Sequence, residues 1–73
     1  MNLKELRKES GIKAYIIAEK LDISRVQFNN IEKGKSKLDM LKIEKLSDIY
    51  GKSVDEIEKA YEVTRDERRR KNI

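Results

Sequence analysis

Residues 25–30 read RVQFNN and place one cation and three amide side chains within six residues. An arginine can form two hydrogen bonds with guanine in the major groove of DNA, and asparagine or glutamine can do the same with adenine. A valine methyl can touch the thymine methyl. Such side chains on one face of a helix are therefore chemically able to read bases, although the same residue types are also common on an ordinary solvated surface.

The two apolar neighbours indicate which helix face would remain outside. Phe28 and Ile31 are three positions apart, so in a helix they share a face and are expected to pack inward. The opposite face would then carry Val26, Asn29, Asn30 and Lys33, with Arg25 and Gln27 on its flanks.

Local start and stop signals predict that residues 24–33 form this helix. Ser24 and Gln27 have the spacing of a capping box, in which each residue satisfies a backbone N–H of the other. Ile23 before the cap and Phe28 have the spacing of a hydrophobic staple. Gly34 then predicts a left-handed end.

Four other short helices are expected to hold this one in place. They are predicted to begin at Asn2, near Ala14, at Asp39 and at Ser53, and Gly11 and Gly51 are expected to end the first and fourth. Each carries an apolar stripe for a shared core: Leu3 and Leu6; Ile17, Ala18 and Leu21; Leu41, Ile43, Leu46, Ile49 and Tyr50; Val54, Ile57 and Tyr61. The predicted fold class is all-α, a compact five-helix domain over residues 1–63.

Residues 64–73, TRDERRRKNI, are expected to form a separate basic tail. Thr64 and Glu67 could cap a last short helix, but such a segment has almost no apolar face to bury. A short isolated helix is marginal in water, which favours a frayed, mobile tail.

Composition argues against several classes of function. The chain has 73 residues and contains neither cysteine nor histidine, so thiolate chemistry, the usual zinc ligands and the most common general base are missing. The carboxylates have ordinary surface spacings, so neither an enzyme nor a metal site is expected, nor a cofactor or small-molecule ligand. The longest apolar run, AYIIA, is too short to cross a membrane. A cytoplasmic location is expected.

The formal net charge of +4 is unevenly distributed along the chain. Residues 24–37 contain four cations and one acid, whereas residues 38–64 contain four cations and seven acids. Residues 65–73 again favour cations, with five against two acids. One end of the molecule is thus expected to be basic and suited to a polyanion, and the other acidic.

The stretch GIKAYIIAEKLDISRVQFNNIEKGK resembles the helix-turn-helix of the lambda-repressor and Cro-like (Xre-type) family. The similarity begins at LKELRKESG, continues through IAEKL, IS and IEKG to LSDIYGKSVDEI, and covers residues 3–57 in register. The resemblance implies that residues 14–21 cross the DNA backbone while residues 24–33 enter the major groove. It implies a bacterial or phage regulator of double-stranded DNA, most simply a repressor that occupies an operator.

The resemblance also assigns roles to individual positions. The implied base-reading residues are Arg25, Val26, Gln27, Asn29 and Asn30. The implied phosphate contacts are Lys13, Tyr15, Ser24, Lys33, Lys35, Ser36 and Lys37. In this family the arginine of LxELR pairs with the glutamate of IEKG, which predicts a partly buried ion pair between Arg7 and Glu32.

The sequence departs from the family pattern at three places. Ala14 stands where a phosphate-binding glutamine is usual, so Lys13 or Tyr15 is expected to replace that contact. Asp22 occupies a turn position that commonly carries glycine, and it tolerates a left-handed backbone better than most residues. Leu38 stands where a proline is usual.

Two further hypotheses concern partners. A single recognition helix covers few base pairs, so a homodimer on a palindromic operator is expected, with an interface at Ile57 and Tyr61. The competing function is a protein-binding adaptor or antagonist that keeps the fold, which the apolar Tyr15 and Ile16 would favour.

Overall fold

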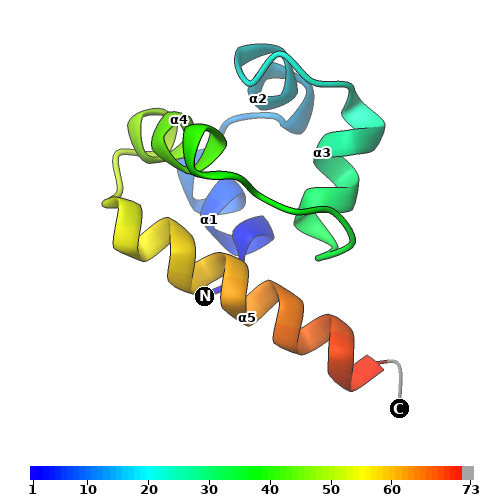
Figure 1. The fold of residues 1–73 in the computed structure, drawn as a ribbon. Coiled ribbons are helices and arrows are strands. Elements are labelled where there is room, and N and C mark those ends of the chain that lie inside the picture. Colours follow the sequence, from blue (N-terminus) through cyan, green and yellow to red (C-terminus); the bar gives the residue numbers. More distant parts are fainter. Residues whose placement is uncertain (72–73) are drawn as a thin grey trace.

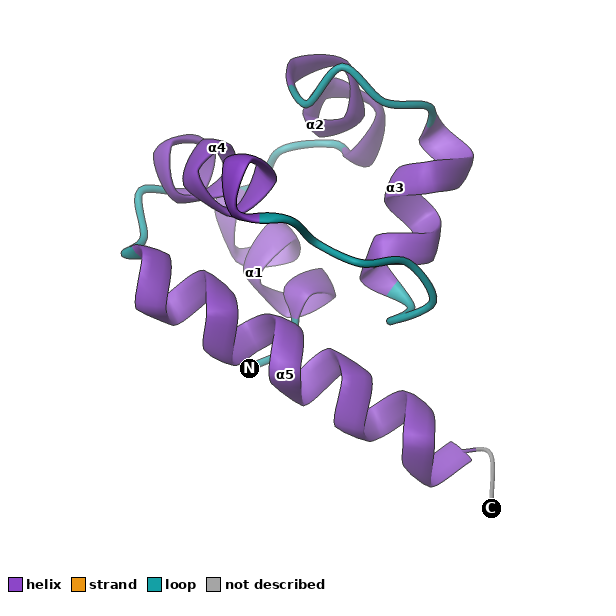
Figure 2. Cartoon of the chain, in the orientation of Figure 1, coloured by secondary structure: helices purple, strands orange, loops and turns teal. Residues whose placement is uncertain are grey.

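Five helices joined by short turns build the protein, and the computed structural model describes residues 1–71. The helices are α1 (Leu3–Ser10), α2 (Ala14–Lys20), α3 (Arg25–Glu32), α4 (Met40–Tyr50) and α5 (Val54–Lys71) (Figure 1). Within the described residues there is no strand, and Figure 2 shows helices and loops only. The all-α, five-helix prediction is confirmed.

Side-chain caps start the first and last helices, as the sequence predicted. The Glu5 backbone N–H donates to Asn2 Oδ1 at 2.8 Å, and the Asn2 N–H donates back to Glu5 Oε1 at 2.9 Å. Ser53 and Glu56 form the same reciprocal pair at the start of α5. These contacts satisfy backbone donors that a helix cannot satisfy internally, and so they fix where α1 and α5 begin.

The helices share one apolar core. Ile31 from α3 is completely buried, as are Ile17 from α2 and Ile57 from α5. The other buried apolar side chains are Leu3, Leu6, Ala18, Leu21, Phe28, Leu38, Ile43, Leu46 and Ala60. Because Phe28 and Ile31 are held in this core, the rotation of α3 about its axis is fixed and its outer face is determined.

The fourth helix differs from the prediction at its first turn. Asp39 caps it by accepting a hydrogen bond from the Lys42 N–H at 2.9 Å, and this bond lowers the pKa of Asp39 below its usual value. Leu41 was expected in the apolar stripe but is 62% exposed. Ile43 and Leu46, which lie two and five positions further on, take the inward face of α4, so Leu41 points away from the core.

The largest difference from the sequence prediction lies in α5, which continues through residue 64 to Lys71. The expected boundary at residue 63 and the separate tail are absent from the described residues. Asn72 and Ile73, the last two residues of the predicted tail, lie outside them. A helix of 18 residues replaces a short helix followed by a frayed segment.

A buried threonine explains why α5 does not end at residue 63. The Thr64 hydroxyl donates to the Ala60 carbonyl at 2.9 Å and accepts from the Leu3 N–H at 3.0 Å. The neighbouring turn is tied to α1 as well, because Asn2 Nδ2 donates to Glu67 Oε1 at 2.7 Å. Thr64 and Glu67 had the spacing to cap a separate short helix, but they instead join the middle of α5 to the start of α1.

None of the helices described here combines the length and apolar character that crossing a membrane requires.

Candidate nucleic-acid interface

The second and third helices pack against each other across a tight turn (Figure 1). Asp22 lies in that turn with φ at 58°, a left-handed conformation that aspartate adopts more readily than most residues. The Ile23 N–H then donates to the Ala18 carbonyl at 3.0 Å, which closes the turn onto α2. The sequence had identified Asp22 as able to replace the usual glycine, and its conformation agrees with that interpretation.

The start of α3 is capped from one side only. The Gln27 N–H donates to Ser24 Oγ at 3.0 Å. The return bond expected from a capping box, from the Ser24 N–H to the Gln27 side chain, is not formed, so that prediction is corrected. The Gln27 side chain is exposed, and within residues 1–71 it has no hydrogen-bond partner.

The residues expected to read bases form the outer surface of α3. Val26 is 70% exposed, Arg25, Gln27 and Asn29 are exposed, and Asn30 is half-buried. In the described part of the chain, the three amide side chains make no hydrogen bond to protein. Their donors and acceptors are therefore available to a ligand, and an apolar methyl group lies among them.

One base-reading candidate has a neighbour that the sequence did not predict. The Arg25 guanidinium lies over the ring of Tyr15, with its central carbon 5.3 Å from the ring centroid. Tyr15 is on α2 and 44% exposed, and it was expected to contact phosphate. Because Tyr15 and Arg25 belong to different helices and no local pattern joins them, only the α2–α3 packing reveals the contact. Stacking of this kind limits the directions in which an arginine can point.

This contact leads to a prediction that separates two roles for Tyr15. If the ring orients Arg25, Tyr15→Ala should weaken recognition by about 0.5 to 1 kcal/mol at the base pair that Arg25 reads. Tyr15→Phe keeps the ring and should bind like the parent. Quantitative binding to duplexes that vary at single positions measures both effects. A uniform loss of affinity in Tyr15→Phe would instead assign the hydroxyl to a phosphate contact.

The expected phosphate-binding residues lie mainly in the loop that follows α3. Lys33, Lys35 and Lys37 are exposed there, and Gly34 has the predicted left-handed conformation with φ at 78°. The Asn30 carbonyl accepts from the N–H groups of Lys35 and Ser36, at 2.8 and 3.2 Å. The loop is thus folded back onto α3.

Three other residues were expected to contact phosphate, namely Lys13, Ser24 and Ser36. Lys13 and Ser24 are exposed at the starts of α2 and α3, where each is the N-terminal cap residue. Ser36 is half-buried, and its carbonyl accepts a hydrogen bond from the Tyr61 hydroxyl at 2.9 Å. This hydrogen bond joins the loop after α3 to α5.

An ion pair links α1 to the end of α3. Arg7 Nε donates to Glu32 Oε2 at 2.7 Å, and the two side chains are only 19% and 7% exposed. An arginine can bond a carboxylate through two N–H groups, whereas one hydrogen bond is present here. The bond raises the pKa of Arg7, and burial together with the Glu32 charge raises that of Tyr50. The C-terminal end of α3 is therefore anchored to α1 by a largely buried ion pair.

The two residues predicted for a dimer interface are both used within the monomer. Ile57 is 0% exposed, so the proposal that it touches a second copy is corrected: it has no surface to offer. Tyr61 is half-buried and its hydroxyl is bonded to the loop after α3. The exposed apolar side chains near α5 are instead Met1 and Val63.

Residues 1–71 contain no cluster of three or more aspartate or glutamate side chains placed to hold a metal ion.

Comparison with known proteins agrees with the helix-turn-helix arrangement of α2 and α3. A family model described as helix-turn-helix matches residues 3–57, well over half of the chain. The match includes α1 to α4 and the start of α5, and it ends before the C-terminal half of that helix. Neither the search of curated proteins nor that of solved structures found a match.

Proposed function

This chain belongs to the helix-turn-helix family, and from that premise we propose that it is a sequence-specific DNA-binding repressor. The family match supports a regulator that binds double-stranded DNA. The observation that carries sequence specificity is the outer face of α3, where an exposed cation, an exposed methyl group and unpartnered amides are presented together. Such a face matches the chemistry of the major groove.

In the proposed mechanism α3 lies in the major groove while α2 crosses the DNA backbone. Arg25 donates to a guanine, and Val26 packs against a thymine methyl. Gln27, Asn29 and Asn30 are the candidates for adenine. The polar contacts discriminate between bases because a wrong base leaves a donor or acceptor unpaired. The Val26 contact discriminates because thymine alone presents a methyl group there.

Phosphate contacts supply affinity and position in this mechanism. Lys33, Lys35 and Lys37 follow α3 directly, so they would lie along the edge of the groove that α3 occupies. Lys13 and Ser24 would contact the backbone near the start of each helix. Such contacts carry no sequence information, and they make binding dependent on salt concentration.

Repression is proposed to follow from occupancy of an operator. The eight residues of α3 extend about 12 Å, which covers only about three or four base pairs. A site of that size does not identify one locus in a genome, so two copies on a palindromic operator are proposed. Weak association would suffice because adjacent half-sites raise the local concentration of the second copy.

The proposed dimer contact uses the exposed side of α5 instead of Ile57. Val63 and Met1 border a shallow groove of about 480 Å³ between α1 and α5, which also contains Glu9, Glu56, Lys52 and Lys59. Glu9 and Lys52 already form an ion pair at 3.2 Å, so Glu56 and Lys59 are the charges that two copies related by a twofold axis would pair. Tyr61, which the sequence had suggested, does not border this groove and packs on the loop after α3 instead.

If this surface forms the dimer contact, a substitution on it should change the number of copies that bind one duplex. Val63→Glu should bind a palindromic duplex with one copy where the parent binds two, because a charge replaces the apolar centre of the contact. Sedimentation equilibrium at protein excess measures the ratio. Val26→Glu, which also adds a carboxylate to an exposed valine, should instead weaken binding of every copy. A two-to-one complex in Val63→Glu would move the interface elsewhere.

Selection of bound sequences from a pool of random duplexes tests the proposed function. A sequence-specific regulator enriches one motif, and a twofold repeat within it supports the dimer. The adaptor hypothesis predicts no enrichment even at low salt. The exposed apolar ring of Tyr15, which favoured that hypothesis, has an alternative explanation in its stacking with Arg25.

A further inference from the structure

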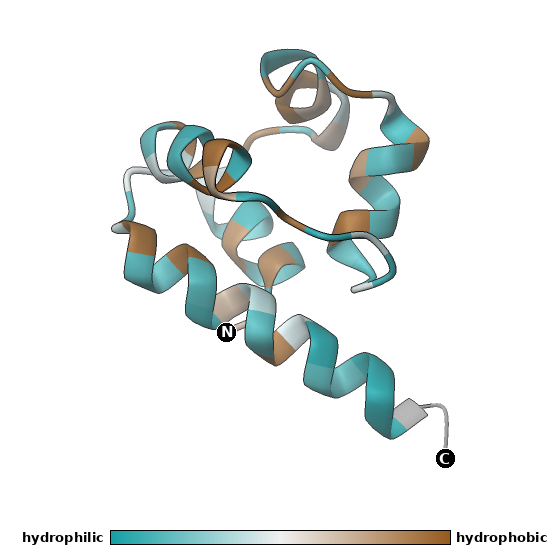
Figure 3. Ribbon diagram, viewed as in Figure 1, coloured by the Kyte–Doolittle hydropathy of each residue, from teal (hydrophilic) through white to brown (hydrophobic). Residues whose placement is uncertain are grey.

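The C-terminal half of α5 is strongly basic and lies outside the matched family region. Residues 65–71 contain five cations, and Figure 3 shows this end of the helix as almost entirely hydrophilic. Cations in the last turn of a helix are stabilised by its dipole, which explains their general enrichment there. The dipole does not determine which face of the helix they occupy.

One face of this segment packs directly on the loop that follows the recognition helix. A Cβ atom at Gly34 would lie 3.3 Å from the Thr64 carbonyl oxygen and 3.5 Å from the Arg68 Cβ. Earlier in α5, the Tyr61 hydroxyl donates a hydrogen bond to the Ser36 carbonyl of the same loop. The central carbon of the Arg65 guanidinium lies 5.8 Å from the centroid of the Tyr61 ring. Two basic segments that are distant in sequence are therefore adjacent in space.

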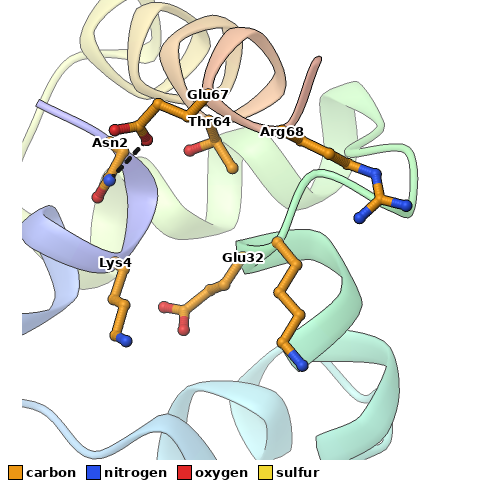
Figure 4. A pocket seen from close by; sticks show the side chains of 7 residues that line it. Asn2, Lys4, Glu32, Thr64, Glu67 and Arg68 are labelled. Carbon is orange, nitrogen blue, oxygen red and sulfur yellow. Dashed lines mark hydrogen bonds between the residues drawn. The ribbon is translucent and has the colours of Figure 1, made fainter. Parts of the chain in front are cut away.

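A groove of about 480 Å³ lies where α5 meets the N-terminus of α1 and the end of α3 (Figure 4). Its cationic lining residues are Lys4, Lys33 and Arg68. In Figure 4 the Arg68 side chain extends away from Glu67, toward the loop after α3. The same face thus gathers cations from three helices or their ends.

The carboxylates of this groove already have partners. Glu32 is bonded to Arg7, and Glu67 accepts from Asn2. Among the described residues, no carboxylate lies within 4.0 Å of the Lys33 ammonium or the Arg68 guanidinium. These two cations therefore retain their capacity to bind an external anion.

We propose that Arg68 adds a phosphate contact to the one assigned to Lys33, so that α5 also holds the DNA backbone beside the bases read by α3. The proposal rests on the proposed DNA binding and extends the interface from the helix-turn-helix to α5. An arginine suits this role because its planar fork matches two phosphate oxygens. Packing against Gly34 places Arg68 next to the lysines that follow α3.

Salt titration of duplex binding tests the proposal. Arg68→Ala removes the guanidinium but keeps the Cβ that packs near Gly34. It should reduce the slope of log affinity against log salt by about one, with the same preferred sequence. Arg69→Ala removes the same charge from the next position, where Arg69 is 70% exposed and 3.8 Å from Asp66, and its slope should match the parent's. Thermal melting is the check that both variants remain folded.

Phosphate replacement then locates the contact. Methylphosphonate substitution at single positions of the selected duplex should reveal one phosphate whose loss weakens the parent but not Arg68→Ala. Equal slopes for Arg68→Ala and Arg69→Ala, or the same sensitive phosphates in parent and variant, would overturn the inference while leaving DNA binding by the parent intact. An Arg68-dependent rise in the melting temperature with inorganic phosphate alone, without a change of slope, would assign the groove to a free anion. If the parent itself selects no sequence, the proposed function fails first.

Discussion

Glu32→Gln is expected to lower the free energy of unfolding by about 2 to 3 kcal/mol, because it leaves the Arg7 charge buried without a counter-ion. The Glu32 side chain is 7% exposed and that of Arg7 19%, so water restores only part of the lost interaction. A change of this size lowers the melting temperature of a small domain by roughly 10 to 20 °C. Thermal unfolding followed by circular dichroism measures it.

The control for this prediction is another ion pair with far greater exposure. Asp66→Asn removes one carboxylate from the pair with Arg69, whose side chains are 61% and 70% exposed at a separation of 3.8 Å. Exposed pairs contribute little, so the melting temperature should change by only a degree or two. If Glu32→Gln melts within a degree of the parent, the buried pair does not anchor α3 energetically.

Arg25→Ala is expected to cost about 1 to 3 kcal/mol of binding free energy at one base pair and to abolish the preference there. The guanidinium is exposed at the start of α3 and stacked on Tyr15, so it is presented to a ligand in a restricted range of directions. Binding measured against a set of duplexes, each changed at one position, resolves the effect. The preference at all other positions should remain.

Lys35→Ala supplies the comparison. Lys35 is exposed in the loop after α3 and is expected to contact phosphate, so its loss should weaken binding to all duplexes alike and reduce the salt slope by about one. Arg25→Ala should thus lose affinity at one base pair only, whereas Lys35→Ala should lose it equally for every duplex. A uniform loss in Arg25→Ala would contradict its assignment as a base-reading residue.

Local sequence signals predicted the first four helices well because their ends depend on neighbouring residues. The caps at Asn2 and Asp39 act within three positions, and Gly11 and Gly51 adopt the left-handed conformation that ends a helix. The inward positions of Phe28 and Ile31 followed from helical spacing alone. The outer face of α3 could therefore be deduced before its surroundings were known.

The length of α5 could not be predicted in this way. Residues 64–71 have almost no apolar face, and helix propensity alone does not support so short a segment. The stabilising contacts come from the other end of the chain, where the Leu3 N–H and the Asn2 side chain bond to Thr64 and Glu67. No periodicity within residues 64–71 encodes partners more than 60 positions away.

Contacts between distant segments were also missed at the candidate nucleic-acid interface. The stacking of Arg25 on Tyr15 joins two helices, and the approach of Arg68 to Gly34 joins α5 to the loop after α3. Ile57 was misassigned for a related reason: spacing identified its helix face, but only the packed structure shows that the monomer buries it fully.

The most direct test of base reading by α3 is an NMR measurement of contacts between Val26 and the selected duplex. Val26 is 70% exposed at the centre of the proposed interface and has methyl groups suited to isotope-edited spectra. Base reading predicts intermolecular nuclear Overhauser effects between these methyls and major-groove protons, such as a thymine methyl. Their absence, with DNA-induced shifts confined to residues outside α2, α3 and the loop after α3, would contradict it.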